Sequence, residues 1–341
     1  MFADDLLDDA ESLAAADPLL RRLADAGSRV RRESGAAAEA IVALQDDLRP
    51  RAVIVAGADS RLLRAVLESW CPVPFVAWPG PGLPGWAGSL DMVVVLAQAA
   101  GDLAASSAIS EAVRRGCTLV ITASPHSVAA DTAAGRYTTL LPTHTEDPLA
   151  SAVVLLQALH RYGLGPDVDA EEVAQSLDDV AVACSPFQDL SNNPAKELAI
   201  ALADVNPVLW GGSVLAARAA RRVAEAIRRA TGRSALAADA EHLLPVLSAT
   251  RPRDLFADPF TGGDDKLGVA LVVLDDGTQE SPVRVERGRL VTQAESHGAR
   301  VHYLRAERGS GVARYASLLA QGSYAAAYLG IGLGRAGDQG A

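Results

Sequence analysis

The sequence predicts an α/β protein made of two three-layer αβα domains with parallel sheets, linked by helices. Short, continuously apolar segments alternate with helical segments, which is typical of a parallel sheet covered by helices on both faces. This alternation stops over a nearly all-helical stretch from residue 148 to residue 204 and then starts again. The segments Val53–Ser60 and Val208–Ser213 both have the order strand, glycine turn, serine and helix. Two similar domains explain this repetition better than one large sheet.

Five apolar runs predict the strands of the first domain, which we place at residues 36–165 after an N-terminal helical segment at residues 1–35. Helices are expected between the runs. One run contains Pro74, which has no amide hydrogen to donate, so we expect that strand at an edge of the sheet. The five predicted strands are residues 52–56, 73–78, 91–97, 118–122 and 137–141, with 91–97 central.

The second domain is predicted at residues 206–333, after a helical connection at residues 166–205. A long helix rich in alanine and arginine follows Ser213, and a final helix begins near Gly311. The predicted strands are residues 207–210, 234–238, 269–274 and 300–304. Residues 334–341 are polar, so we expect a disordered tail.

Composition excludes several classes of protein. The chain has 341 residues, with 31 Lys plus Arg against 42 Asp plus Glu and a net charge of −11, so no basic face for nucleic acid is expected. No apolar run reaches the ~18–20 residues of a membrane span. The acidic start, Met1–Asp5, is unlike a secretory signal. We therefore expect a cytoplasmic protein that contacts neither nucleic acid nor membrane.

Cysteine and histidine spacing predicts neither a metal site nor a disulfide framework. The three cysteines are widely separated and odd in number. None of the six histidines has the spacing of a zinc site. We expect no metal and no cofactor.

The two glycine turns are candidate anion-binding sites. A turn between a parallel strand and a helix presents amide groups and the positive helix end at the carboxyl edge of the sheet. Serines at the helix starts donate to an anion or simply cap the helix, and the sequence leaves both interpretations open. The candidate ligand-binding residues of these turns are Gly57, Ser60, Gly211, Gly212 and Ser213.

Two further groups of side chains are candidates for chemistry. His242 follows the second turn of the second domain and lies beside Asp239 and Glu241, so it is a candidate proton-transfer group. The alternative is an ordinary residue of a helical first turn. The arginine-rich helix that contains Arg221 is either a solvated face or a phosphosugar clamp.

Several motifs resemble the double sugar-isomerase (SIS) domain architecture of the bifunctional phosphoglucose/phosphomannose isomerases, over roughly residues 35–332. Asn193-Pro-Ala-Lys196-Glu-Leu-Ala199, followed by Asn206-Pro-Val-Leu-Trp-Gly211, resembles the family's entry to its second domain. Ser317–Leu329 resembles its closing helix. The resemblance implies aldose–ketose isomerisation between glucose 6-phosphate or mannose 6-phosphate and fructose 6-phosphate. It also implies a sugar-phosphate ligand and a homodimer.

The motifs of the family's active site are degenerate in this chain. The hydroxyl-rich phosphate loop of the family aligns with Ala97–Asp102, which contains Gly101 as a remaining candidate but no hydroxyl group, and which adds a carboxylate. Asp59 lies in the first glycine turn, where a carboxylate would repel phosphate. The family's glutamate base has no counterpart in this chain. Its C-terminal lysine has none either, because the chain has only two lysines and the last of them is Lys266.

Two hypotheses follow. In the first, the chain is a hexose-phosphate isomerase with relocated groups, in which His242 acts with Glu241 or Glu225 in proton transfer. In the second, it is a non-catalytic relative that binds a phosphosugar or a partner protein and regulates sugar-phosphate metabolism.

Overall fold

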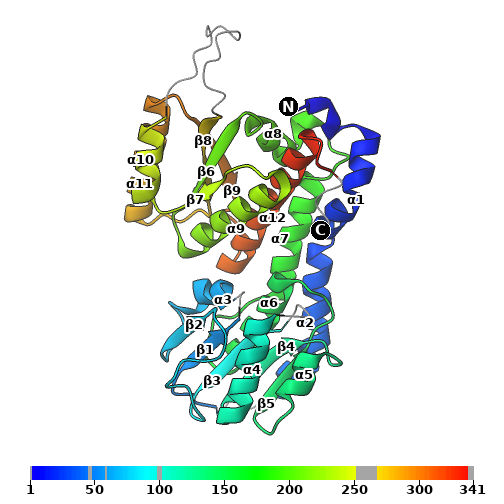
Figure 1. Cartoon of the computed structure of the whole chain (residues 1–341), viewed down its shortest axis with the longest axis vertical. Helices are drawn as coiled ribbons and strands as arrows, with labels where there is room; N and C mark the ends of the chain where they lie inside the picture. Colours follow the sequence, from blue (N-terminus) through cyan, green and yellow to red (C-terminus); the bar gives the residue numbers. More distant parts are fainter. Residues whose placement is uncertain (1, 45–47, 58–59, 98–101, 251–266, 337–341) are drawn as a thin grey trace. The chain divides into compact units, whose positions relative to one another are not determined.

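The computed structural model describes residues 2–44, 48–57, 60–97, 102–250 and 267–336 (Figure 1). The chain divides into two compact units. One unit is the continuous segment Ala26–Gln175, and the other combines Met1–Asp25 with Ser176–Ala341. We call them the middle unit and the terminal unit.

The sheet of the middle unit has five parallel strands in the order β2-β1-β3-β4-β5. Apart from the first residue of β4, its central strands are buried, which explains their continuous valine, isoleucine and leucine runs. The strand with Pro74 before it lies at the edge, as predicted. The strands are β1 (Val53–Ala56), β2 (Phe75–Trp78), β3 (Met92–Leu96), β4 (Thr118–Ala123) and β5 (Thr138–Pro142).

Helices cover both faces of this sheet. Ile54, Val93 and Ile121 point to one face, where they pack against α4 and α5. Helices α2, α3 and α6 contact strands and one another on the other side. The helices are α2 (Ala26–Val42), α3 (Ser60–Leu67), α4 (Leu103–Arg115), α5 (Val128–Ala133) and α6 (Pro148–Arg161).

The terminal unit has a four-stranded parallel sheet in the order β7-β6-β8-β9. Val208, Trp210 and Val273 pack against α10 and α11 on one face. Helices α9 and α12 contact strands and each other in the same unit. The strands are β6 (Val205–Gly211), β7 (Leu236–Ala237), β8 (Gly268–Asp275) and β9 (Arg300–Arg305). The helices are α1 (Ala10–Ala24), α7 (Ala170–Ala183), which begins in the middle unit, α8 (Pro194–Ala201), α9 (Val214–Thr231), α10 (Ala240–Ser248), α11 (Ser281–Ser296) and α12 (Gly311–Gly332), with short 3-10 helices at Asp4–Leu7 and Leu190–Asn192.

The two ends of the described chain pack together within the terminal unit. The amide of Ala3 donates to the carbonyl of Gly332 at 2.8 Å. A Cβ atom on Gly332 would lie 2.2 Å from the ring of Phe2, so only glycine leaves room for that ring. The first residues of the chain are therefore an integral part of the fold that the last residues complete.

A buried lysine holds the same N-terminal segment. The ammonium of Lys196, which has no solvent exposure, donates to Asp8 Oδ1 at 2.6 Å and to the carbonyls of Pro186 and Gln188 at 3.0 and 3.1 Å. It also lies 5.7 Å from the ring centroid of Tyr328. These partners satisfy a charge that burial alone would strongly disfavour.

The predicted fold class is confirmed: two α/β units with parallel sheets, joined through helices. The domain limits at residues 35, 165, 205 and 333 stay predictions, and the predicted tail lies outside the described residues from residue 337 onward. Among the described residues, no helix combines the length and apolar character that a bilayer crossing needs.

Candidate functional site

Both sheets have a reversal of strand order next to their first strand. In such sheets, ligands bind outside the carboxyl ends of the strands, in the crevice where the connections diverge to opposite faces. The reversal lies between β1 and β3 in the middle unit and between β6 and β8 in the terminal unit. These are the places where Gly57 and Gly211 end their strands.

In the middle unit, the reversal point contains a carboxylate of the chain itself. Asp102 Oδ1 accepts hydrogen bonds from the amides of Ala104 and Ala105 at 2.9 and 3.0 Å, so it caps α4. Gly57 has a φ of +96°, and a Cβ atom built on it would lie 3.8 Å from Asp102 Oδ2. The amides that would hold a phosphate at this helix end already hold Asp102.

The other candidates of the middle unit are placed differently. Ser60 is the first residue of α3, but its hydroxyl is inaccessible to solvent and has no hydrogen-bond partner among the described residues. Gly101 and Asp59 lie outside the described residues. Their roles stay predictions.

In the terminal unit, a second carboxylate lies at the equivalent point. Ser213 Oγ accepts from the amide of Ala216 at 3.0 Å, which caps α9, and donates to Asp276 Oδ2. The other oxygen of Asp276 accepts from the amide of Thr278 at 3.2 Å. Asp276 is buried and follows β8, so this bond crosses the reversal point.

Gly211 and Gly212 are required by packing. A Cβ atom on Gly211 would lie 2.2 Å from the carbonyl carbon of Ala216, and one on Gly212 would lie 2.2 Å from Val283 Cγ1. Larger residues would push α9 and α11 away from the strand. This close approach explains both glycines without a ligand, and their role in ligand binding stays a prediction.

Two arginines lie beside the second carboxylate. Arg314, in the first turn of α12, donates through Nη1 to the carbonyl of Asp276 at 2.6 Å. Its Nε is inaccessible and has no hydrogen-bond partner among the described residues. Arg287 donates to Asp275 Oδ2 at 2.5 Å, which neutralises that carboxylate. The carboxyl edge of the terminal sheet thus holds the guanidinium of Arg314, which uses only some of its donors, and the carboxylates of Asp275 and Asp276, which both accept hydrogen bonds.

The structure brings three predicted residues to one turn. Glu241 and His242 are exposed in the first turn of α10, which follows β7. Because β7 runs parallel to β6 and next to it, this turn lies at the same sheet edge as Ser213. The guanidinium of Arg221 is 3.6 Å from Asp239 Oδ1 at the start of α10. Arg221, Glu241 and His242 therefore lie around the β7–α10 turn.

Glu225 lies one helical turn beyond Arg221 on α9. It is eleven residues beyond Val214 on α9, which corresponds to about 16 Å along the helix axis. Its carboxylate accepts from Arg222 Nη1 at 2.7 Å. The contacts of the described residues do not connect Glu225 with His242, and its catalytic role stays a prediction.

A buried carboxylate that the sequence did not mark lies beyond β5. Glu33, on α2, is fully buried, and its Oε2 accepts from the amide of His144 at 2.7 Å. Asp147 caps α6 nearby in sequence and accepts from Arg29 Nε at 2.7 Å. Thus the carboxyl edge of the middle unit holds Asp102, Glu33 and Asp147, each bonded to donors of the protein itself. No cluster of three metal-ligating side chains occurs among the described residues.

Comparisons with known proteins identify the fold. Residues 191–336 match the family described as bacterial phospho-glucose isomerase C-terminal SIS domain. A search of curated proteins found no match. The chain is similar to a glucose-6-phosphate isomerase-like protein from Thermus thermophilus, with a TM-score of 0.58 and 18% identity over 98% of this chain and 96% of that chain. It is also similar to tagatose-6-phosphate ketose/aldose isomerase from Escherichia coli, with a TM-score of 0.64 and 12% identity over 97% and 95%.

Both of these matched structures span nearly the whole chain, including the middle unit, which the family match does not cover. The predicted SIS resemblance is confirmed at this level. Residues 191–336 therefore resemble the bacterial phospho-glucose isomerase C-terminal SIS domain, and the whole chain has the two-domain fold of the phosphosugar isomerase-like structures that it matches.

Proposed function

We propose that this chain is a regulatory SIS protein of sugar-phosphate metabolism that binds a sugar phosphate without isomerising it. The observation that carries this proposal is the position of Asp102, whose carboxylate accepts the first amides of α4 at the reversal point of the middle sheet. A phosphate at this helix end would compete with Asp102 for the same donors and would meet its negative charge.

Isomerisation needs both an anchor for the phosphate and a base near C1 and C2 of the sugar. Each such group contributes about 2–4 kcal/mol to the stabilisation of a transition state. The first anchor is filled by Asp102, and the family's glutamate base has no counterpart in this chain. These two losses support binding rather than turnover.

The terminal unit offers the better place for an anion. Arg314 lies in the first turn of a helix that follows β9, so its charge lies at the carboxyl edge of the sheet. Arg314 Nη1 donates to a carbonyl, which is neutral, so this hydrogen bond does not neutralise the positive charge of the guanidinium. A guanidinium in such a position suits the oxygens of a phosphate monoester.

A second candidate function is a hexose-phosphate isomerase with relocated groups. Glu241 and His242 favour it, because both are exposed at the same sheet edge as Ser213. In this reaction a carboxylate removes the proton from one of the two carbons C1 and C2 and returns it to the other through an enediol, while the histidine moves the proton between the two oxygens.

One experiment separates the two candidates. The purified chain is incubated with fructose 6-phosphate, and NMR follows glucose 6-phosphate and mannose 6-phosphate, while thermal unfolding is measured with and without the sugar phosphate. We expect no product and a ligand-induced rise in Tm that Arg314→Gln abolishes. Product formation that His242→Ala abolishes would establish the second candidate. No rise in Tm with the unmodified chain would overturn sugar-phosphate binding.

The role of Asp102 has its own test. Asp102→Ser keeps a side-chain oxygen that caps α4 but removes the charge. We expect inorganic phosphate to raise the Tm of this variant more than that of the unmodified chain. The matched control is Asp9→Ser, because Asp9 caps α1 in the same way through the amide of Ser12 at 2.8 Å. An equal effect of phosphate on both variants would contradict the assignment.

The assembly and location of the chain belong to the same proposal. We propose a homodimer in the cytoplasm, on the ground given by the family resemblance. Light scattering coupled to gel filtration tests the dimer: a mass near twice 35.3 kDa supports it, and a mass near 35.3 kDa overturns it.

A further inference from the structure

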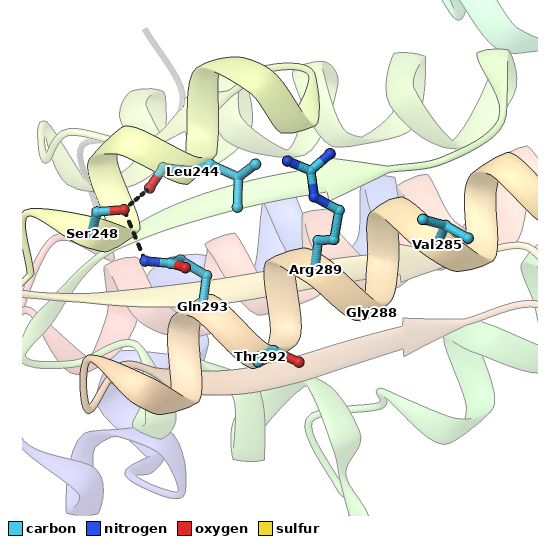
Figure 2. Close-up of a pocket in the computed structure, with 7 residues that line it drawn as sticks. All are labelled: Leu244, Ser248, Val285, Gly288, Arg289, Thr292 and Gln293. Atoms are coloured by element: carbon cyan, nitrogen blue, oxygen red, sulfur yellow. Dashed lines mark hydrogen bonds between the residues drawn. The ribbon is translucent and has the colours of Figure 1, made fainter.

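A groove in the terminal unit lies between α10 and α11 (Figure 2). It is a largely open groove of about 560 Å³, a volume within the range of small-molecule sites. Leu244 and Val285 form apolar walls, and Ser248, Thr292 and Gln293 add polar groups. Helix α10 follows β7 and helix α11 follows β8, and both pack on the same face of the terminal sheet. The groove therefore lies within one layer of helices.

Arg289 supplies the charge of this groove. Figure 2 shows its side chain reaching from α11 into the space between the helices. Within the described ranges, its guanidinium forms no hydrogen bond or ion pair. Arg287 on the same helix differs, because Asp275 accepts from it at 2.5 Å. Arg289 is therefore a cation available to an anion from outside the chain.

Gly288 leaves one side of the groove without a side chain. It lies inside α11, where glycine weakens a helix relative to alanine. A Cβ atom at this position would meet no atom within 4 Å, so packing in the described chain does not require glycine here. Gly288 lines the groove, and a side chain there would occupy part of its volume.

The polar end of the groove is held in a fixed arrangement. Gln293 Nε2 donates to Ser248 Oγ at 2.9 Å, and Ser248 Oγ donates to the carbonyl of Leu244 at 2.8 Å (Figure 2). This chain of bonds ties α10 to α11 on one side of the groove. The groove thus exists before any ligand binds, which reduces the ordering cost of binding.

We propose that this groove binds a small organic anion with an apolar body. The carboxylate or phosphate of the ligand pairs with Arg289, and the body lies over Gly288 between Leu244 and Val285. This site is separate from the carboxyl-edge site and goes beyond the function proposed above.

The test uses two probes of the same shape, 4-phenylbutyrate and the neutral 4-phenylbutan-1-ol, with binding measured by ligand-observed NMR on the full chain. We expect the anion to bind at least about five-fold more tightly than the alcohol, as a partly exposed ion pair allows. Added NaCl should reduce this preference. Equal affinities for the two probes would overturn the proposal.

Variants assign the binding to the groove. Arg289→Gln should abolish the preference for the anion, whereas Arg284→Gln, a change at an exposed arginine of the same helix that does not line the groove, should preserve it. Gly288→Leu should weaken both probes by filling the groove. Far-UV circular dichroism and Tm confirm that each variant is folded. Loss of the preference in Arg284→Gln, its persistence in Arg289→Gln, or displacement of the probe by fructose 6-phosphate would contradict a separate site for amphipathic anions.

Discussion

Ser213 donates a hydrogen bond to Asp276 across the reversal point of the terminal sheet. The relationship has a counterpart in the middle unit, where a Cβ atom built on Gly57 would lie 3.8 Å from Asp102 Oδ2. In both units, a carboxylate that follows the third strand of the α/β pattern approaches the turn that follows the first. A carboxylate thus lies at the reversal point of each sheet, and in the middle unit it accepts the helix amides that this fold ordinarily offers to an anion.

Removing the hydroxyl of Ser213 should destabilise the terminal unit. Ser213→Ala loses both the cap of α9 and the hydrogen bond to buried Asp276, so we expect a loss of about 1–2 kcal/mol in the free energy of unfolding. Urea denaturation measures it. Ser110→Ala is the control, because the exposed Ser110 hydroxyl donates only to the carbonyl of Ser106 within α4. Equal losses in the two variants would show that the bond to Asp276 contributes nothing.

Lys196 should control the attachment of the N-terminal segment. Lys196→Met leaves Asp8 and two carbonyls without their donor, so we expect a loss of about 2–4 kcal/mol. Trypsin should then cleave more quickly at Arg21 and Arg22 in α1, as followed by mass spectrometry. Asp8→Ala should cost no more than about 1 kcal/mol, because the Asp8 side chain is half exposed and Lys196 keeps its carbonyl partners. If Asp8→Ala lost as much stability as Lys196→Met, the carbonyl partners of Lys196 would not carry most of its contribution, and the assignment would be wrong.

His302 should make the protein sensitive to mild acid. Burial lowers the pKa of this imidazole, and the neighbouring Arg300 lowers it further, against a smaller opposing effect of Glu197. Because the folded pKa is below the unfolded value of 6.5, the unfolded chain binds the proton more readily. This contribution to stability is present above pH 6.5 and decreases as the pH falls below that value. Urea midpoints between pH 7.5 and 5 should fall less steeply for His302→Leu, and a control at exposed His126, His126→Gln, should retain the slope.

The three thiols should differ in reactivity. Burial raises the pKa of Cys184 to about 12, and it also raises the pKa of Cys117 and of Cys71. Cys117 and Cys184 are buried, whereas Cys71 is partly exposed. In the native protein at pH 8, we expect Ellman's reagent to modify Cys71 slowly and the other two only after unfolding. Cys71→Ser should remove the native reaction, and a remaining native reaction of similar rate would contradict the assignment.

The fold could be predicted because its signals are local. Continuously apolar runs such as Met92–Leu96 mark strands that are buried on both faces, and Pro74 marks an edge. The repeated glycine turns were placed at the carboxyl edge of each sheet, and the strand order of the structure shows that both follow the strand beside the reversal point. These features depend on residues close together in the sequence, so they needed no knowledge of tertiary contacts.

The content of the candidate site was harder to predict, because it depends on neighbours across the sheet. Asp275 and Asp276 directly follow a predicted strand, as Ser60 does after the first glycine turn. They could therefore have been marked as candidates at the carboxyl edge of the sheet as well. Only the strand order shows that Asp276 meets Ser213. Glu33 bonds to an amide 111 residues away, and nothing in the pattern of α2 indicates this. The sequence likewise could not show that Gly211 is required by the backbone of α9.

The contact between Ala3 and Gly332 has a consequence for the order in which the protein folds. Because the first 25 residues belong with Ser176–Ala341, the ribosome synthesises the whole middle unit before the partners of those residues exist. Domains fold as units during synthesis. The middle unit is therefore expected to fold first, while the N-terminal segment waits for the last helix of the chain. A chain truncated before α12 would leave that segment without its main partner, so the synthesis of α12 becomes the step that closes the terminal unit.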